Sequence, residues 1–187
     1  VTITSTGGNI DFSSTIKSDS TARNFTISSG AGTVNIVGNI GGSATTDLAA
    51  IDINASAGAG NITLGGDIGT DSISGATTID IGNAATGTLS LDGAEYSSTG
   101  IQTFTADAFD LAGTDPTFST AGVNINFVDG GAAANLVLGD NADLEINTNL
   151  GGNAAGNISI ADNITIIGIQ NNDAQDVVLN AGTSTGT

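Results

Sequence analysis

The stretch FTISSGAGTVNIVGNIGG (residues 25–42) contains two short triplets, Phe25–Ile27 and Val34–Ile36, in which two apolar residues flank a polar one. Alternation with a period of two places both apolar side chains of a triplet on the same face of a β-strand. The small residues SSGAG separate the two triplets and are typical of a tight turn. The stretch therefore predicts two short strands joined by a turn.

Similar pairs of triplets recur along the whole chain, and strands this short must stack on copies of themselves to be stable. The first triplets are Val1–Ile3, Phe25–Ile27, Ile51–Ile53, Ile79–Ile81, Phe104–Ala106, Val123–Ile125, Leu144–Ile146 and Ile164–Ile166. The second triplets are Ile10–Phe12, Val34–Ile36, Ile62–Leu64, Leu89–Leu91, Phe109–Leu111, Leu136–Leu138, Ile158–Ile160 and Val177–Leu179. Some segments add a third apolar residue four positions after the second triplet, namely Ile16, Ile40 and Ile68.

This repetition predicts a single all-β domain over residues 1–187, folded as a parallel β-helix, or β-solenoid, of about eight rungs of about 23 residues. Inward-facing Ile, Val, Leu and Phe side chains from successive rungs would then form continuous apolar columns. An antiparallel β-sandwich is the alternative, because turn signals every 8–12 residues or so also suit that class.

The composition excludes several classes of function. The 187 residues include 19 Asp and Glu but only 2 Lys and Arg, which gives a formal net charge of -17. Such a chain is a poor ligand for nucleic acid or for an anionic membrane surface. It has neither Cys nor His, which excludes disulfides, cysteine nucleophiles and the commonest transition-metal ligands. No apolar run approaches the roughly 20 residues of a membrane-spanning helix, so we expect no membrane insertion.

Neither end of the repeat shows the polar cap that solenoids use to cover their last strand edge and open core. Val1 enters the first triplet directly, and only NAGTSTGT follows Val177–Leu179. We therefore expect either part of a longer fibrous protein or a subunit that associates with itself end to end.

The stretches FTISSGAGTVNIVGNIGG (25–42) and IDINASAGAGNITLGGDIGT (51–70) resemble the rungs of filamentous-haemagglutinin-like proteins and of other bacterial β-helical exoproteins of the two-partner and autotransporter type. The resemblance implies a right-handed parallel β-helix that is secreted to the cell surface as a stalk, fibre or adhesive filament. It further implies an extracellular, non-enzymatic structural protein, but it does not identify a receptor. A host-cell or matrix glycan or protein is the kind of receptor that we expect for such a filament. No functional residue is carried over, because the shared pattern is structural.

Acidic turns suggest calcium as the only ion this chain would hold, without any obligatory cofactor. Ca²⁺ takes six to eight oxygen ligands from carboxylates, carbonyls and water. Asp67 and Asp71 lie in GGDIGTDSI (65–73), which matches the calcium-roll nonapeptide except for one additional residue. Asp140, Asp143 and Glu145 lie in DNADLE (140–145). A calcium-dependent assembly or surface-layer module is therefore an alternative function.

A carbohydrate-active β-helix enzyme is the second alternative, because paired carboxylates perform acid–base chemistry on glycosides. The candidates are Asp107, Asp110 and Asp115 in TADAFDLAGTDPTF (105–118), and Asp140, Asp143 and Glu145 in LGDNADLEIN (138–147). A sugar-binding groove also needs aromatic and basic side chains, and this chain has 4% aromatic residues and two basic ones. Asp is also a common residue of turns, which explains these carboxylates without catalysis. We therefore expect no enzymatic activity.

Two further features have structural interpretations. Several Asn residues lie near the starts of second strands and can form hydrogen-bonded ladders along the axis, namely Asn9, Asn35, Asn61, Asn157 and Asn163. The segment FTADAFDLAGTDPTFST (104–120) contains three of the six Phe residues and the only Pro. It is either a local variant of the core packing or a recognition patch with exposed aromatic side chains.

Overall fold

The computed structural model describes residues 1–42, 48–55, 57–69, 76–111, 115–131, 133–140, 142–150, 156–168 and 175–182. These residues form eighteen β-strands of three to five residues each. No helix in this part of the chain has the length and apolar character needed to cross a membrane.

The strands lie in three parallel sheets, which the chain visits in turn. Sheet A contains β1 (Thr2–Thr4), β3 (Phe25–Ser28), β5 (Ala50–Ile53), β7 (Thr78–Ile81), β10 (Gln102–Ala106), β13 (Ile125–Asp129) and β16 (Ile158–Ile160). Sheet B contains β2 (Ile10–Phe12), β4 (Val34–Ile36), β6 (Ile62–Leu64), β8 (Thr88–Leu91), β11 (Ala108–Leu111), β14 (Asn135–Leu138) and β17 (Thr165–Gly168). Sheet C contains β9 (Glu95–Ser98), β12 (Thr117–Thr120), β15 (Leu144–Asn147) and β18 (Val177–Asn180).

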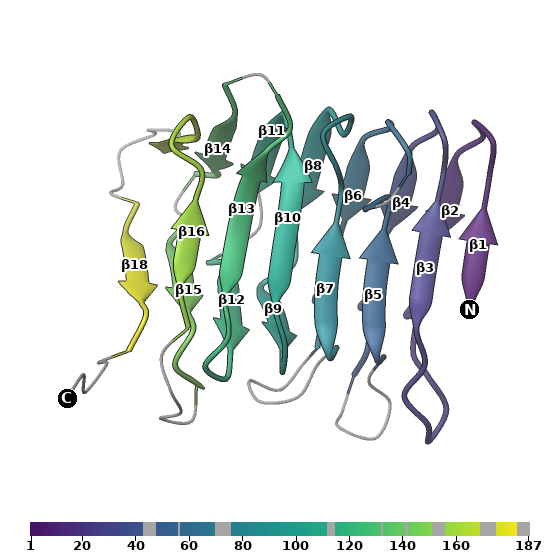
Figure 1. Cartoon of the computed structure of the whole chain (residues 1–187), viewed down its shortest axis with the longest axis horizontal. Coiled ribbons are helices and arrows are strands. Elements are labelled where there is room, and N and C mark those ends of the chain that lie inside the picture. The colour runs from purple at the N-terminus through teal and green to yellow at the C-terminus, as the bar shows by residue number, and fades with distance from the viewer. Residues whose placement is uncertain are drawn as a thin grey trace.

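All the strand pairs within these sheets are parallel. In Figure 1 the strands of sheet A lie side by side and point the same way, from β1 at the right to β16 towards the left. The β-solenoid expected from the repeat is therefore confirmed, and the antiparallel sandwich is wrong. The physical reason is that each strand finds its partner one winding later in the chain.

The core consists of stacked side chains from equivalent positions in successive windings. In sheet A, Ile27 pairs in register with Ile53, which pairs with Ile81. In sheet B, Ile36 pairs with Leu64 in the same way. These side chains are at most 1% exposed. Within each strand, the residue next to the buried one faces outward. Burial of the apolar columns and the continuous backbone hydrogen bonds together stabilise the rod.

The expected eight rungs of about 23 residues are not formed. Sheets A and B contain seven strands each, and the register step ranges from 20 residues, between Leu89 and Phe109, to 33, between Phe127 and Ile160. Leu144–Ile146, interpreted as the start of a rung, belongs to sheet C instead. All three sides of the solenoid require the same apolar alternation, so the pattern alone does not tell one side from another.

The third apolar contact expected at Ile16, Ile40 and Ile68 is confirmed. These residues form a parallel series of single bridges that ends at Tyr96 in β9. Sheet C therefore begins as isolated paired residues in the early windings and becomes a sheet of true strands from β9 onward.

The aromatic side chains of the segment 104–120 lie inside the rod, so the packing interpretation is confirmed and the recognition patch is wrong. Tyr96, Phe104, Phe109, Phe118 and Phe127 are at most 1% exposed. Their rings form one cluster with centroid distances of 4.8 to 6.2 Å, in stacked and edge-to-face arrangements. The hydroxyl of Tyr96 accepts a hydrogen bond from the Gly93 N–H at 2.9 Å, and burial raises the pKa of Tyr96 far above its ordinary value.

Candidate functional site

The outer face of sheet C carries a column of oxygen-bearing side chains. Glu95 of β9 pairs in register with Thr117 of β12, which pairs with Glu145 of β15. Alternation along each strand decides their direction: the next residues, Tyr96, Phe118 and Ile146, are fully buried in the core. The neighbours in sequence therefore point outward, and two carboxylates flank a hydroxyl on three successive windings.

Aspartates at the corner before sheet C join one winding to the next. Their Oδ1 atoms accept hydrogen bonds of 2.7 to 3.1 Å from backbone N–H groups of the following winding. The bonds run from Ala94 and Glu95 to Asp67, from Asp143 to Asp115, and from Asp176 to Asp143. These carboxylates satisfy backbone donors that the corner would otherwise leave unpaired, and they gather negative charge along one edge of the sheet.

A hollow of about 420 Å³ lies over this face. It is lined by residues of four successive windings, including Asp67, Glu95, Asp115, Thr117, Ser119 and Glu145. A second hollow of about 280 Å³ continues the acidic surface past Asp115 and Glu145 to Asp143 and Asp176. The two basic side chains of the chain, Lys17 and Arg23, line neither of them.

The calcium candidates from the sequence are distributed over this surface unevenly. Asp67 and Glu145 line the larger hollow, and Asp143 and Glu145 line the smaller one. Asp140 lies at the turn after β14 and lines neither hollow. Asp71 lies outside the described residues. Within the described ranges no three His, Cys, Asp or Glu side chains are grouped closely enough to hold a metal ion by themselves.

Sequence reasoning missed Glu95 and Ser119 as members of this surface. A signal for Glu95 was present, because Glu95 and Glu145 are the only two glutamates of the chain and each directly precedes a buried apolar residue. No signal in the sequence distinguished Ser119 from the other serines of the chain.

Three of the six carboxylates considered for acid–base chemistry, Asp115, Asp143 and Glu145, line the smaller hollow on sheet C. The others lie elsewhere. Asp115 also lines the larger hollow on sheet C, whereas Asp110 lies in β11 of sheet B and pairs in register with Ser90. Asp107 lies between β10 and β11. In sheet B, partial desolvation and then the charge of Asp110 raise the pKa of Asp92.

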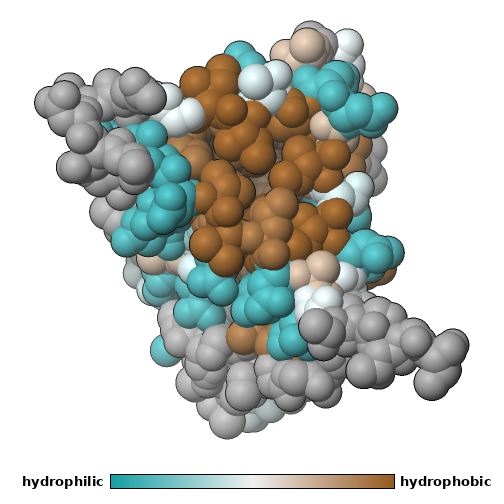
Figure 2. All heavy atoms as spheres, turned by 90° about the vertical axis from the view of Figure 1, so that its left-hand side faces the viewer, coloured by the Kyte–Doolittle hydropathy of each residue, from teal (hydrophilic) through white to brown (hydrophobic). Residues whose placement is uncertain are grey.

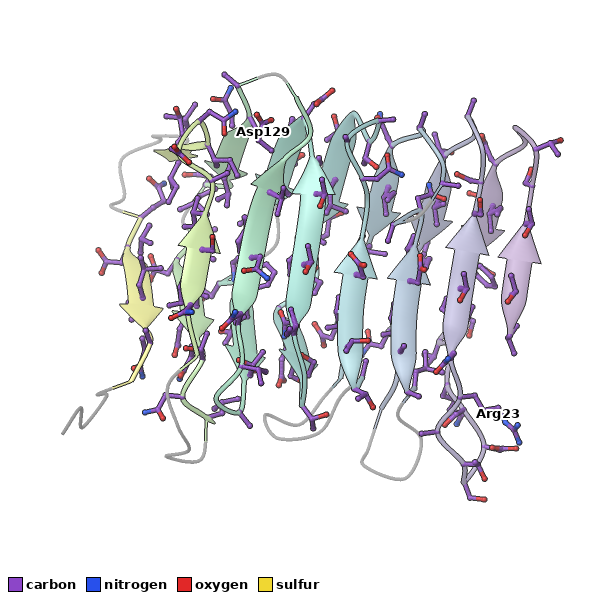
Figure 3. All side chains as sticks on the ribbon, in the orientation of Figure 1. Arg23 and Asp129 are labelled. Carbon is purple, nitrogen blue, oxygen red and sulfur yellow. The ribbon has the colours of Figure 1, made fainter. Side chains whose placement is uncertain are left out.

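The asparagines connect windings, although not through an amide-to-amide ladder. The side-chain oxygens of Asn9 and Asn61 accept hydrogen bonds from the backbone N–H groups of Thr33 and Thr88, at 3.1 and 3.0 Å. Asn157 donates its backbone N–H to Asn124 at 2.9 Å. The other two asparagines are placed differently: Asn35 pairs in register with Asp11, and the side-chain amide of Asn163 donates to Asp129, labelled in Figure 3.

The two ends of the rod differ in charge. Lys17 and Arg23 both lie on the loop between β2 and β3, where Arg23, labelled in Figure 3, forms an ion pair of 2.9 Å with Asp19. They border a hollow of about 290 Å³ whose apolar wall includes Ile3, Phe12 and Ile16.

The opposite end is apolar at its centre. Figure 2, which views the rod from the side of β18, shows a broad hydrophobic area bordered by hydrophilic residues. Val177 and Leu179 of β18, in register with the buried Leu144 and Ile146, are 40% and 53% exposed. No described strand pairs with the outer edge of β18.

No protein-family model, curated protein or solved structure matches this chain. Its function is therefore argued from the solenoid itself. Three features are available for that argument: the outer faces of the sheets, the acidic hollows on sheet C, and the two open ends.

Proposed function

We propose that this chain is a non-enzymatic structural segment of an extracellular bacterial stalk, fibre or adhesive filament. It would form a right-handed β-helical rod of the filamentous-haemagglutinin-like kind. The observation that carries the proposal is the pair of open ends. In the part of the chain that the structure describes, each end presents strand edges without a partner strand around an apolar core, which is the surface that another parallel winding covers.

The charges at the two ends favour joining in one direction. Lys17 and Arg23 lie beside the apolar hollow at the amino-terminal end. Asp162 and Asp176 lie exposed near the opposite end. Arg23 is already paired with Asp19, so a head-to-tail contact brings mainly Lys17 towards these carboxylates around the apolar centre. Such a heterologous contact does not close on itself, so it extends the rod into a filament.

The sides of the rod suit a filament exposed to solvent. The formal net charge of -17 keeps parallel rods apart. The exposed positions on sheets A and B are mostly Thr, Asn, Ser and Asp. A receptor on this surface would be a glycan or protein that accepts a flat array of hydroxyl and amide groups.

Sedimentation velocity and negative-stain microscopy of the purified chain test the proposal. We expect association that increases with concentration and produces end-to-end rods. Leu179→Asp, which places a charge in the apolar end, should leave 18.1 kDa monomers of unchanged circular dichroism. Val37→Asp is the matched control, because Val37 is 56% exposed but lies on the side of the rod after β4.

Two results would overturn the end-to-end proposal. One is a wild-type chain that stays monomeric at high concentration. The other is equal loss of association in Leu179→Asp and Val37→Asp, which would indicate lateral contact instead.

A further inference from the structure

The larger hollow on sheet C contains acidic groups that no basic side chain offsets. Glu95 and Glu145 are two windings apart, about 10 Å at the usual strand spacing, with Thr117 between them. Asp67 and Asp115 border the same hollow, and Lys17 and Arg23 do not. Like charges held close together around a partly enclosed space repel each other unless a cation joins them.

Ser119 supplies the second, independent observation. It faces outward from β12, between the buried Phe118 and Thr120, and lines the hollow. Even so it is only 2% exposed. Its Oγ has no hydrogen-bond partner among the described residues. A buried hydroxyl without a partner is unfavourable in a folded protein, so this atom indicates that something with a polar atom occupies the hollow.

We propose that this hollow binds a hydrated calcium ion, with Glu95, Glu145, Thr117 and Ser119 as its side-chain oxygen ligands, directly or through water. The chain has no His or Cys, so hard oxygen ligands are all it offers. Ca²⁺ tolerates the irregular coordination that such widely spaced oxygens impose, whereas Mg²⁺ demands near-ideal octahedral geometry. This site would connect three windings across the outer face of sheet C.

The geometry also sets the strength of binding. Because no three acidic side chains in the described ranges converge on one point, much of the coordination shell remains water. Sites of this kind bind with dissociation constants of about 10⁻⁴ to 10⁻³ M, the range of extracellular calcium modules. An extracellular rod would meet enough calcium to fill such a site, and chelation would empty it.

The single tyrosine offers a direct probe. Tyr96 follows Glu95, and the chain has no Trp. Terbium, an oxygen-seeking ion of calcium's size, emits under tyrosine excitation only when it binds near that ring. We expect saturable emission that Ca²⁺ displaces, at least a fivefold weaker affinity in Glu145→Gln, and unchanged affinity in Asp80→Asn. Asp80→Asn is the matched control, because it removes one charge from the outer face of sheet A instead.

Thermal unfolding gives a second readout. At 10 mM CaCl₂ and fixed ionic strength, a millimolar site should raise the Tm by about 3–5 °C relative to chelator. The Ser119→Ala variant tests whether the Ser119 hydroxyl binds the ion or is only a buried hydroxyl without a hydrogen-bond partner. If Ser119 binds the ion, the alanine variant keeps or gains Tm in chelator but loses most of the calcium shift.

Three outcomes would overturn the proposal: no saturable terbium emission, an equal calcium shift in wild type and Glu145→Gln, or an equal shift with magnesium. The site does not depend on how the ends join. Filaments that form equally well in chelator would leave the proposed function intact and separate it from the ion site.

Discussion

The early and late windings of this rod build the third side of the solenoid in different ways. In the first windings that side is a single paired residue, Ile16, Ile40 or Ile68. From β9 onward it is a strand of four residues. The winding that contains β9 is not longer than the one before it, because the register step is 28 residues from Ile53 to Ile81 and 23 from Ile81 to Phe104. The step increases only later, to 33 residues from Phe127 to Ile160. The residues that the early windings place in loops form a sheet in the later ones.

The core changes together with the third side. A single bridged residue contributes one inward side chain, whereas a strand such as β12 contributes two, Phe118 and Thr120. A third side of full strands surrounds a wider interior, and protein interiors must be filled without voids. Aromatic rings fill the interior of the later windings, where five of them cluster as the strands of sheet C begin. The core of the early windings consists mainly of Ile, Val and Leu. Only the later region has an outer face on sheet C that can hold the acidic hollow.

The largest expected effect tests the wider core. Phe118 has ring contacts with Tyr96, Phe104 and Phe127 at 4.8 to 5.2 Å and is fully buried. Phe118→Ala should lower the free energy of unfolding in urea by about 3–5 kcal/mol. The loss combines removed apolar contacts with a cavity that the neighbouring rings cannot fill.

Phe12→Ala is the matched substitution in the early region. Phe12 is half-buried near the amino-terminal end and has one ring contact, with Phe25 at 5.9 Å. Its loss should be less than half that of Phe118→Ala. Equal losses at the two positions would show that the aromatic cluster contributes no more than an ordinary apolar side chain at the end of the rod.

A second effect concerns the corner before sheet B, where the early windings stack glycines. Gly32, Gly60 and Gly87 occupy equivalent positions in successive windings. A Cβ at Gly60 would overlap the backbone carbonyl of Gly32. Gly60→Ala should therefore cost about 2–3 kcal/mol of unfolding free energy, because backbone must move to admit it.

The later region has no such requirement, since Ala134 occupies the corresponding position before β14. Ala134→Gly should cost only about 1 kcal/mol, from added chain entropy and lost packing. Chemical denaturation of both variants checks the contrast. A smaller cost for Gly60→Ala than for Ala134→Gly would mean that the corners of the two regions are equally spacious.

The contrast between the two regions also explains what the sequence could predict. Alternating triplets such as Phe25–Ile27 specify strands, and their repetition specifies parallel stacking, which the structure confirms. The pattern does not specify the side of the solenoid. Leu144–Ile146 has the same alternation as a sheet A strand, yet its partners in β12 and β18 place it in sheet C. Which strands a triplet pairs with depends on the loop lengths and the core volume over several windings. The local alternation of apolar and polar residues carries no information on either.

The acidic hollow was predictable only in part, for a similar reason. Asp67 and Glu145 were candidates because they lie in acidic turns, but their companions were sought nearby in sequence. In the structure the neighbours of Glu145 are Thr117 and Glu95, one and two windings earlier. Proximity along the rod is set by register, so residues 28 and 50 positions apart in sequence line one surface.

The smallest expected effect concerns a carboxylate pair on sheet A in the early region. Asp52 and Asp80 pair directly in register on adjacent strands. Partial desolvation raises the pKa of Asp80 above its ordinary value of 3.8, and the charge of Asp52 raises it further. The folded state therefore holds the proton more tightly than the unfolded state, and the pair lowers stability as the pH rises through the raised pKa.

Asp80→Asn should consequently stabilise the rod at pH 7 by about 0.2–1 kcal/mol, the usual size of a cross-strand charge pair. The gain should fade as the pH drops towards 3.8 and vanish below it, where the Asp80 carboxyl is protonated in either state. Asp11→Asn is the control, since its register partner is the neutral Asn35. Melting temperatures of both variants at pH 7 and pH 3 test this prediction. If the gain in stability of Asp80→Asn persists at pH 3, or if Asp11→Asn shows the same gain at pH 7, the effect comes from net charge rather than from this pair.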